Sequence, residues 1–530
     1  MPRKTTMLDP NPNPLSLPEL FQNNLARCAD KPAIFFGGRV LTFAEFDRLS
    51  ANVAGALAAR GVGRGDRIGL YCPNSDAFAI AYFGILKAGA AVVPLNLLLN
   101  PKEVAFILND AGAKALLYHE AFAPAVAALR GSVPGLAFLA CIGAGNPLND
   151  LPFSAFTISY QPFAMPTLDP AGDLVAIIYT SGTTGRPKGA MLTHRNLFFN
   201  TLSVQQALQL QPGQEIFITV LPMFHAFAAT ACMLSPLLYG NAIVPLPKFD
   251  PGQVADAIAA TRATIFCGVP SMFTSLLRLP DAAVPKFASL RYAVSGGAAL
   301  PVAVLKQFEQ KFGKVIYEGD GPTECSPVTC VNPIGGRAKP GTVGRPVPFV
   351  EMQIRDDAGV ELPRGQIGEI CVRGPNVMQG YWKLPDETRD AFFGEWFRTG
   401  DLGCVDADGY FSIVDRKKDM IIVNGMNVYP RIIEELLYRH PAVREAAVVG
   451  EPDELHGEIP VAFVVLKENA AATAADLRAF CREQLGRHEV PRKVFFRPEL
   501  PKNAAGKILK RELRAAGELE RGVDSRQPGG

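Results

Sequence analysis

A segment of eleven residues, YTSGTTGRPKG from Tyr179 to Gly189, gathers the residue types that bind a polyphosphate. Two glycines allow tight turns in which successive backbone N–H groups point at an anion. Three hydroxyl side chains add hydrogen-bond donors, and a lysine adds a positive charge. These residues are Gly182, Gly185, Ser181, Thr183, Thr184 and Lys188. The order differs from the GxxxxGKS/T nucleotide loop, and the alternative is a flexible turn with a solvated lysine. The length and order of the segment favour a phosphate-binding loop.

Four further segments with chemically useful side chains follow this loop. They are EGDGPTE (318–324), FRTGD (397–401), DRKKDMIIVNGMNVYPRIIEE (415–435) and PKNAAGKILKREL (501–513). Together with the loop they resemble the ordered motifs of the adenylate-forming superfamily, which includes acyl-CoA synthetases, firefly luciferase and the adenylation domains of peptide synthetases. The resemblance covers the chain from about residue 30 to about residue 515. It implies that ATP activates a carboxylic acid as an acyl-adenylate with release of pyrophosphate. A thiol, that of coenzyme A, then takes the acyl group and AMP is released.

The loop at 318–324 lies against adenine in this family. By position, the resemblance implies nucleotide contacts from Glu318, Gly319, Asp320, Gly321 and Thr323. The family usually has an aromatic residue between the two glycines, and its ring stacks on the base. Asp320 stands there in this chain, and an aspartate has no stacking face. We expect backbone groups and a neighbouring ring to compensate, with Tyr317 as the candidate.

The magnesium ion that accompanies ATP is implied to bind Glu324 and, across the triphosphate, Thr180. Both side chains supply oxygen ligands, which Mg²⁺ prefers together with substrate phosphates. Thr180 and Lys188 are also expected to contact the phosphates, and Lys188 is counted among the catalytic residues. A Thr-Glu pair standing alone would be interpreted as a surface turn.

Asp401, at the end of FRTGD, is implied to accept hydrogen bonds from both ribose hydroxyls, and Arg416 matches the family arginine that also reaches the ribose. For either residue alone, a surface salt bridge is the ordinary interpretation.

The resemblance assigns roles to three residues in the hinge and the small C-terminal domain. By family register, Lys418 is the hinge, where a few element-terminal residues absorb the change in backbone torsions. Lys507 is the family's catalytic lysine, which would stabilise the charge that develops when the carboxylate attacks phosphorus. Gly425 would allow the pantetheine arm of coenzyme A to pass closely, and a plain β-turn glycine is an equal alternative.

The acyl group is expected near LPMFHAFA, where His225 matches a pocket-lining position, and near SGGAAL, which contains Gly296 and Gly297. His225 is also counted among the catalytic residues, although a histidine in an apolar run is often a core residue. The stretch 221–240 carries no acidic or basic residue besides this histidine, which favours a medium- or long-chain fatty acid over an amino acid. An aromatic acid, a separate carrier protein as the acceptor and a silent nucleotide-binding module are the alternatives.

The elements that must position these residues follow from the hydrophobic pattern. Between Asp173 and about Leu300, apolar runs typical of strands alternate with helical patterns, which predicts α/β layers with parallel sheet. A weaker alternation occupies about 33–130. Strands are expected at 174–179, 216–220, 242–246, 264–268 and 291–295, and helices at 196–210 and 301–312.

The residue pattern changes twice further along the chain. Short strands between Gly, Pro and Asp turns predict a β-rich subdomain at about 343–414, and the charged run DRKKD predicts a hinge at 415–419. The fold class is therefore α/β. We expect a large N-terminal domain (1–414) of two α/β halves plus the β-rich subdomain, and a small mobile α+β C-terminal domain (420–530).

Composition excludes several other classes of protein. Lys and Arg (53) nearly balance Asp and Glu (51), which gives no reason to expect nucleic-acid binding. The spacing typical of a zinc site is absent, because none of the ten cysteines forms a CxxC pair and the six histidines are scattered. The cysteines are expected to be reduced thiols in a cytoplasmic protein. The N-terminus lacks a secretory pattern, and the most apolar stretch, 226–246, is interrupted by Ser, Pro, Gly and Asn. No transmembrane segment is expected, whereas peripheral membrane contact and a homodimer stay open.

Overall fold

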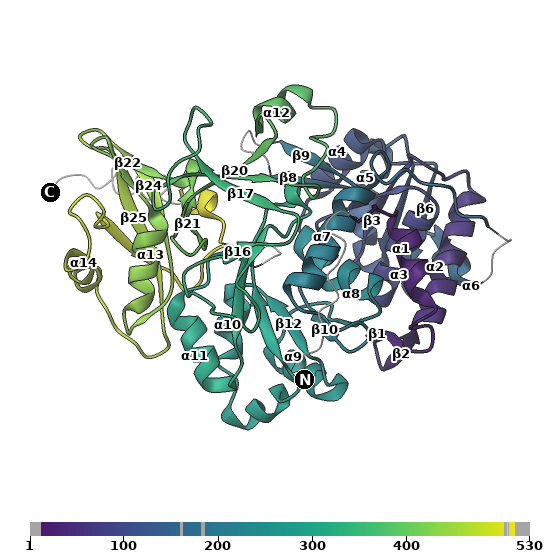
Figure 1. Cartoon of the computed structure of the whole chain (residues 1–530), viewed down its shortest axis with the longest axis horizontal. Coiled ribbons are helices and arrows are strands. Elements are labelled where there is room, and N and C mark those ends of the chain that lie inside the picture. Colours follow the sequence, from purple (N-terminus) through teal and green to yellow (C-terminus); the bar gives the residue numbers. More distant parts are fainter. Residues whose placement is uncertain (1–11, 159–162, 182–185, 503–505, 507, 515–530) are drawn as a thin grey trace. The chain divides into compact units, whose positions relative to one another are not determined.

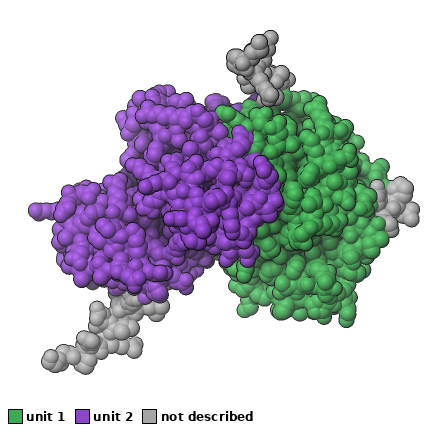
Figure 2. Space-filling model, turned by 90° about the horizontal axis from the view of Figure 1, so that it is seen from below, with its two compact units in different colours: residues 1–248, 322–328, 374–388 green, residues 249–321, 329–373, 389–530 purple. Residues whose placement is uncertain are grey.

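The computed structural model describes residues 12–158, 163–181, 186–502, 506 and 508–514 (Figure 1). The chain forms two compact units, coloured separately in Figure 2. Unit 1 consists of Met1–Lys248, Pro322–Val328 and Gly374–Thr388, and unit 2 of Phe249–Gly321, Thr329–Arg373 and Arg389–Gly530. Each unit is described below by itself.

A seven-stranded sheet forms one half of unit 1. Its strands are, in spatial order, β7 (Leu151–Pro152), β6 (Phe138–Ile142), β5 (Ala115–His119), β3 (Arg67–Tyr71), β4 (Ala91–Pro94), β8 (Leu174–Ser181) and β9 (Pro187–Thr193). All neighbours run parallel except β9, which returns antiparallel to β8. Strand β4 is buried at every position, as parallel strands covered on both faces usually are. The hairpin of β8 and β9 carries the expected phosphate loop.

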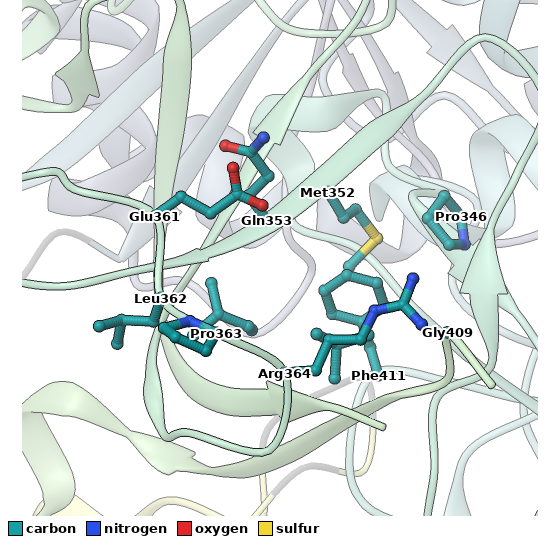
Figure 3. A pocket seen from close by; sticks show the side chains of 11 residues that line it. Pro346, Met352, Gln353, Glu361, Leu362, Pro363, Arg364, Gly409 and Phe411 are labelled. Carbon is teal, nitrogen blue, oxygen red and sulfur yellow. The ribbon is translucent and has the colours of Figure 1, made fainter. Parts of the chain in front are cut away.

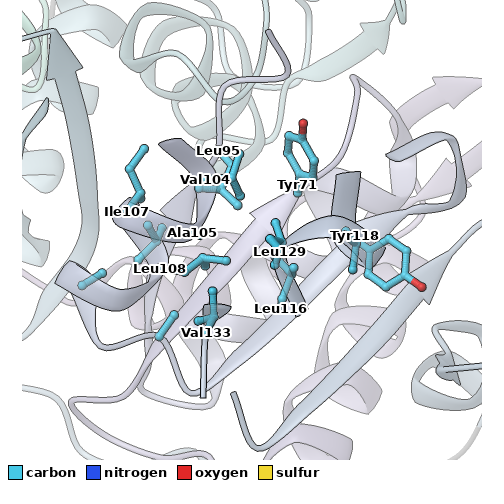
Figure 4. Close-up of a cluster of buried hydrophobic side chains, with 14 of the residues drawn as sticks. Tyr71, Leu95, Val104, Ala105, Ile107, Leu108, Leu116, Tyr118, Leu129 and Val133 are labelled. Atoms are coloured by element: carbon cyan, nitrogen blue, oxygen red, sulfur yellow. The ribbon is translucent and has the colours of Figure 1, made fainter. Parts of the chain in front are cut away.

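Helices with local start signals cover this sheet. Helix α4 (Pro101–Ala111) begins at Asn100, whose side chain accepts from two backbone amides, and ends at Gly112 in the left-handed region. Its inner face meets β3 and β5 in a core that includes Val104, Leu108 and Leu116 (Figure 4). The other helices in unit 1 are α1 (Leu17–Leu25), α2 (Phe43–Ala58), α3 (Asp76–Lys87), η1 (Glu120–Phe122), α5 (Ala123–Leu129), η2 (Arg130–Ser132), α6 (Ser154–Ile158), α7 (His194–Ala207), η3 (Ala228–Leu234), α8 (Ser235–Leu238) and η5 (Thr323–Cys325).

A second group of strands in unit 1 comes from two distant parts of the chain. Strands β10 (Ile216–Thr219) and β11 (Ala242–Pro245) are parallel, β1 (Pro32–Phe36) pairs parallel with β11, and β2 (Arg39–Thr42) closes the edge as a hairpin with β1. Between β10 and β11 lie the apolar helices η3 and α8, whose residues are all buried. The most apolar stretch, 226–246, thus forms buried helix, a turn and the buried strand β11.

Unit 2 begins with three parallel strands, β12 (Ile265–Gly268), β13 (Tyr292–Ser295) and β14 (Ile316–Asp320). Two short antiparallel strands continue them, β15 (Cys330–Val331) and β16 (Arg345–Pro346). The helices along this part are α9 (Pro251–Thr261), α10 (Pro270–Leu276), η4 (Asp281–Phe287) and α11 (Val302–Phe312). Because β13 and β14 run in the same direction, Ser295 and Asp320 end at the same edge of the sheet.

Two five-stranded sheets make up the rest of unit 2. The first contains β17 (Glu351–Arg355), β18 (Gly368–Arg373), β19 (Phe392–Phe393), β20 (Trp396–Val405) and β21 (Phe411–Arg416), all antiparallel. The second contains β22 (Ile421–Val423), β23 (Met426–Val428), β24 (Val443–Asp453), β25 (Gly457–Leu466) and β26 (Lys493–Phe496). The accompanying helices are η6 (Lys417–Asp419), α13 (Pro430–Arg439) and α14 (Ala474–Arg482), and α12 (Pro385–Asp390) precedes β19.

The α/β class expected from the sequence is confirmed, with a large N-terminal domain of parallel and mixed sheets and a smaller C-terminal α+β domain. The strands and helices predicted between 174 and 312 are all present, with ends shifted by no more than a few residues. The hinge at 415–419 lies inside unit 2, and the domain boundaries built on it stay a prediction. The ten cysteines are free thiols. Within the described part of the chain, no helix combines the length and apolar character needed to cross a membrane.

Candidate active site

The base of the expected phosphate loop is held by the β8–β9 hairpin of unit 1. Thr180 and Lys188 are direct partners across this hairpin, and the Thr180 hydroxyl donates to the Lys188 carbonyl at 3.5 Å. Both side chains are half-buried. The loop glycines and threonines, Gly182, Thr183, Thr184 and Gly185, lie outside the described residues, as does the side chain of Ser181. The hairpin thus places Thr180 and Lys188 side by side at the start and end of the loop.

Tyr381 connects this hairpin to the Thr323–Glu324 turn. Its hydroxyl donates to Glu324 Oε1 at 2.9 Å, and Lys188 Nζ lies 5.3 Å from the centroid of its ring. Burial and the neighbouring Glu324 carboxylate raise the pKa of the Tyr381 phenol, so the hydroxyl remains a donor. Tyr381 therefore orients Glu324 and lies against the Lys188 ammonium, although the motifs around these two residues are far apart in the sequence.

The backbone around Tyr381 and Glu324 is fixed by further hydrogen bonds. The Trp382 amide donates to the Gly189 carbonyl at 2.8 Å, and the Met378 amide donates to the Glu324 carbonyl at 2.7 Å. Sequence reasoning missed Tyr381. Its only signal was the run QGYW, which does not by itself show which motif it will meet.

The donors available for magnesium in unit 1 are hard oxygens, the Glu324 carboxylate and the Thr180 hydroxyl. Among the described residues, no group of three or more His, Cys, Asp or Glu side chains could hold a metal ion by itself. This composition fits Mg²⁺, which is usually bound through one or two protein oxygens plus substrate phosphates and waters. The residues present therefore suit a metal that arrives with ATP.

The 318–321 segment forms the end of β14 and the turn after it, in unit 2. A Cβ at Gly319 would lie 2.8 Å from the Cys330 carbonyl oxygen of the neighbouring strand, so close strand packing accounts for this glycine. The Asp320 carbonyl accepts from the Thr329 amide and hydroxyl, both at 3.0 Å. The backbone of the loop is thus firmly held, and the Asp320 side chain is half-exposed.

Tyr317 does not supply the ring expected beside the adenine loop. Its side chain is 7% exposed and packs edge-on against Tyr292 at 5.6 Å between ring centroids. Its hydroxyl accepts from the Gly335 amide at 3.0 Å. Successive residues of a strand point to opposite faces, so Tyr317 faces away from Glu318 and into the packed interior. The hypothesis that Tyr317 compensates for Asp320 is not supported.

Asp401 and Arg416 are brought together by the register of β20 and β21. They are direct partners across the two strands, and Arg416 Nε lies 2.6 Å from Asp401 Oδ1. The Asp401 side chain is 6% exposed and that of Arg416 is 39% exposed. Because the carboxylate is largely shielded from water, this pair is more than a surface salt bridge. The structure thus joins the two residues that the resemblance assigns to the ribose.

Glu369 is a second residue that the sequence did not reveal. It is 3% exposed, and its carboxylate accepts from the Gly400 amide at 3.2 Å and from Arg398 at 3.0 Å. It also binds Lys417 Nζ at 3.1 Å. Glu369 therefore supports the residue before Asp401 and the residue before the expected hinge, Lys418, at the same time.

Lys418 itself is exposed in the short helix η6. Its neighbours are tethered, Lys417 to Glu369 and Asp419 to Arg514 at 2.9 Å. The pivot role of Lys418 stays a prediction.

Gly425 has a sufficient structural explanation. It follows Asn424 in the two-residue turn between β22 and β23, with φ values of 50° and 78° at the two positions. Two successive left-handed residues are what a type I′ hairpin requires, and Asn-Gly is its preferred pair. Nothing lies within 4 Å of a Cβ built at Gly425. The turn alone accounts for the glycine, and passage of coenzyme A stays a prediction.

The expected acyl-binding residues lie at the ends of strands. His225 follows β10 in unit 1 and is half-buried between buried neighbours, and its Nδ1 accepts from the Phe227 amide at 3.3 Å. In unit 2, Gly296 and Gly297 follow β13, and Gly297 has φ +76°. Gly296 is buried and Gly297 is exposed, and the acyl-binding role of these three residues stays a prediction.

Lys507 lies outside the described residues, but its neighbour Gly506 is placed. A Cβ at Gly506 would lie 3.0 Å from Val269 Cγ2 and 2.8 Å from Ser271 Oγ. A Cβ at Gly297 would lie 3.7 Å from Val269 Cγ1. Val269 therefore lies beside both Gly297 and Gly506, the residue before the expected catalytic lysine. Sequence reasoning did not single out Val269.

A cavity of about 650 Å³ in the β-rich part of unit 2 is separate from these residues. Its walls include Met352, Leu362, Arg364 and Phe411 (Figure 3), and none of the expected site residues lines it. A smaller cavity of about 270 Å³ is lined by Lys418 and residues of β24 and β25. Neither cavity contains the residues that the motifs assign to ATP.

Comparison with known proteins identifies the class. A family model described as AMP-binding enzyme matches residues 21–382, and one described as AMP-binding enzyme C-terminal domain matches residues 432–507. The long-chain-fatty-acid–CoA ligase of Bacillus subtilis (strain 168) is 37% identical, over 95% of this chain and 95% of that protein. The feruloyl-CoA synthase of Amycolatopsis sp is 37% identical, over 91% of this chain and 95% of that protein.

A solved structure agrees with these relatives. The crystal structure of the anthranilate CoA ligase AuaEII in complex with anthranoyl-AMP is similar with a TM-score of 0.91 at 32% identity, covering 97% of this chain and 100% of that chain. The chain belongs to the AMP-binding enzyme family of adenylate-forming enzymes. Its activity within the family is that of an AMP-forming acyl-CoA synthetase, a ligase.

Proposed function

We propose that this acyl-CoA synthetase activates a hydrophobic acid, a medium- or long-chain fatty acid, and transfers it to coenzyme A. The observation that carries the proposal is the stretch from Leu221 to Gly240, which has no Asp, Glu, Lys or Arg and is almost entirely buried. An amino acid would bring an ammonium group, which is costly to bury without a carboxylate partner. The similarity to a relative named long-chain-fatty-acid–CoA ligase supports the same substrate class.

The nucleotide-binding roles follow from the two groups of residues already described. In unit 1, Thr180 and Lys188 would bind the phosphates, and Glu324, oriented by Tyr381, would hold magnesium with Thr180. The ion would neutralise phosphate charge. In unit 2, Asp401 would accept from the ribose hydroxyls, and the 318–321 backbone would contact adenine.

Asp320 provides a direct test of the adenine assignment. Because a carboxylate adds negative charge and no stacking surface, Asp320→Tyr is expected to retain activity and to bind ATP at least as well as the unchanged protein. The KM for ATP measured in acid-dependent ATP–pyrophosphate exchange checks this. Loss of ATP use in the variant would show that the family role of this loop does not apply here.

Lys507 is proposed to act in the first half-reaction only. A fixed ammonium there would stabilise the charge on the reacting carboxylate and α-phosphate. Lys507→Ala should abolish adenylate formation, yet it should still convert supplied acyl-adenylate to the thioester. Similar loss of both half-reactions would contradict this division of roles.

Release of AMP, measured with ATP and a panel of acids with and without coenzyme A, tests the function as a whole. The panel contains fatty acids of graded length, aromatic acids and amino acids. Turnover of fatty acids that requires coenzyme A is the expected result. No turnover on any acid would favour a silent nucleotide-binding module, and turnover only with a carrier protein would replace coenzyme A as the acceptor.

An aromatic acid is the second candidate substrate. The specific observation in its favour is the similarity to a feruloyl-CoA synthase and to an anthranilate CoA ligase at comparable identity. The same panel distinguishes the two, since a higher kcat/KM for aromatic acids than for fatty acids would reverse the order of the candidates.

A further inference from the structure

A strained turn follows Glu324 in unit 1. Ser326 has a φ of +76°, in the left-handed region that is unfavourable for most residues other than glycine, and its side chain is buried. A residue in this region persists only where the surrounding structure holds it there. Two buried asparagines, Asn200 on α7 and Asn376, bind the backbone beside Ser326. The proposed function uses Glu324 and leaves these asparagines unexplained.

Asn200 binds both sides of the turn. Its Nδ2 group donates to the Val328 carbonyl at 2.7 Å and, with a longer bond, to the Cys325 carbonyl at 3.4 Å. Its Oδ1 atom accepts from the Val328 amide at 3.2 Å. Asn200 is 0% exposed and is carried by helix α7, so it offers the turn a rigid support. Because Glu324 directly precedes Cys325, the position of its backbone depends on these bonds.

Asn376 makes a second bond to the carbonyl of Cys325. Its Nδ2 group donates to that oxygen at 2.9 Å. Asn376 is 1% exposed, and its Oδ1 atom has no hydrogen-bond partner among the described residues. A buried polar atom without a partner costs free energy, so a contribution to stability alone explains this residue poorly. The buried hydroxyl of Ser326, at the same turn, likewise has no partner in the described part of the chain.

Helix α7 connects this turn with the phosphate hairpin. Its N-cap is Thr193, the last residue of β9, whose amide and hydroxyl both donate to Asn196 Oδ1 at 2.9 Å. Asn196 Nδ2 donates to the Pro375 carbonyl at 2.8 Å and to the Val377 carbonyl at 2.7 Å. Asn196 and Asn200 lie one helical turn apart, on the same face of α7. This face therefore holds the two later segments of unit 1, which carry the expected magnesium ligand and its tyrosine partner.

Another buried asparagine in unit 1 shows the same bonding pattern away from the magnesium ligand. Asn74 Nδ2 donates to the Thr219 carbonyl at 3.0 Å and to the Leu221 carbonyl at 2.8 Å, and its Oδ1 atom accepts from the Met223 amide at 2.7 Å. Asn74 is 4% exposed. The segment that it holds, 219–223, has no acidic side chain. Asn74 can therefore separate the general contribution of a buried asparagine to stability from a contribution to magnesium binding.

We propose that Asn200 and Asn376 are positioning residues for magnesium binding, because they hold the turn at Ser326 so that the Glu324 carboxylate points at the metal that accompanies ATP. This carboxylate is half-exposed, so packing alone does not fix its direction, and the Tyr381 hydroxyl can orient it only where the backbone is correctly placed. Groups that orient a metal ligand typically contribute roughly 10- to 100-fold to metal affinity. This inference rests on the proposed role of Glu324 and goes beyond it by naming the residues that make the role possible.

The test measures the Kd for ATP by calorimetry with and without Mg²⁺, so it does not depend on turnover. The ratio of the two values is the gain in ATP affinity from the metal. In Asn376→Ala this gain should fall roughly tenfold, while the Kd without Mg²⁺ stays within about twofold of that of the unchanged protein. Asn200→Leu, which removes three hydrogen bonds in place of one, should show a larger fall. In a Glu324→Gln background, Asn376→Ala should cause no further fall, because it is proposed to act through Glu324.

Asn74→Leu is the matched control for Asn200→Leu. It should lower the thermal unfolding temperature by a comparable amount and leave the gain from Mg²⁺ unchanged. An equal fall of the gain in Asn74→Leu, or an unchanged gain in Asn376→Ala, overturns the inference, as does a loss in Asn376→Ala that adds fully to the loss in Glu324→Gln. Asn376→Ala removes a single hydrogen bond, so the test stands even if Asn200→Leu does not fold. If Glu324→Gln alone leaves the gain unchanged, the proposed role of Glu324 fails instead, so the two failures are distinguishable.

Discussion

Replacement of Tyr381 by phenylalanine tests whether the Tyr381 hydroxyl orients Glu324 for the binding of magnesium and ATP. The substitution removes the hydroxyl that donates to Glu324 at 2.9 Å and keeps the ring that lies 5.3 Å from Lys188 Nζ. A hydrogen bond to a charged group contributes about 1.5–3 kcal/mol, and each 1.4 kcal/mol is about a factor of ten. Because Glu324 is partly exposed to water, the lower end of this range applies. We expect kcat/KM for ATP to fall about tenfold in Tyr381→Phe.

The assay is ATP–pyrophosphate exchange with an acid that the unchanged protein accepts, with ATP and Mg²⁺ varied in turn. The loss should appear as a higher requirement for Mg²⁺ and ATP, while the KM for the acid changes little, because Glu324 is proposed to hold the metal. Tyr118→Phe is the matched control. Tyr118 lies on β5 of the seven-stranded sheet in unit 1, away from the motifs. Its hydroxyl also donates to a carboxylate, that of Asp150, at 2.7 Å.

Two results would refute the reasoning. The first is a Tyr381→Phe variant within twofold of the unchanged protein at limiting Mg²⁺, which would show that the hydrogen bond does not orient Glu324 for function. The second is an equal loss in Tyr118→Phe, which would point to a general loss of folded protein. Thermal unfolding of both variants separates the two explanations.

Three further predictions concern ATP binding, packing and pH. Asp401→Asn removes the charge that pairs with Arg416 at 2.6 Å, and we expect the KM for ATP to rise about tenfold in initial-rate measurements; an unchanged KM would contradict the ribose assignment. Gly344→Ala would place a Cβ 2.0 Å from the backbone of a neighbouring strand, so urea unfolding should show a loss of more than about 3 kcal/mol, whereas Gly409→Ala, with a similar φ in open space, should lose only about 1–2 kcal/mol. Burial lowers the pKa of His194 from 6.5 to about 4, so the unfolded chain binds an extra proton between these values and the free energy of unfolding should fall by about 3 kcal/mol as the pH drops through this window. In His194→Gln this part of the pH dependence should disappear. If the free energy of unfolding fell equally with pH in both proteins, His194 would not be its cause.

Local patterns in the sequence were sufficient for the class of the protein and for most of its elements. Short apolar runs predicted β8, β10, β11, β12 and β13. This was possible because a short apolar run bounded by turn residues is a local pattern that indicates a buried strand. The motifs likewise named the chemistry of each segment, since glycine, hydroxyl, lysine and carboxylate groups have fixed hydrogen-bonding abilities wherever they occur.

The sequence was less informative where two segments meet. Tyr381 was overlooked because its partners, Lys188 and Glu324, belong to motifs far from it in the chain. Tyr317 was the candidate ring beside adenine, and the sequence did not show that its side chain is buried and packs edge-on against Tyr292. Gly425 needed no ligand to explain it once the hairpin turn was known.

By itself, then, the sequence determined that this chain is an α/β enzyme whose ordered motifs suit ATP and a carboxylic acid. Only the tertiary structure decided which residues lie together: the pairing of Asp401 with Arg416 through strand register, and the link from Tyr381 to Glu324. The physical reason is that residue chemistry is local, whereas strand order and register are set by the packing of the whole sheet.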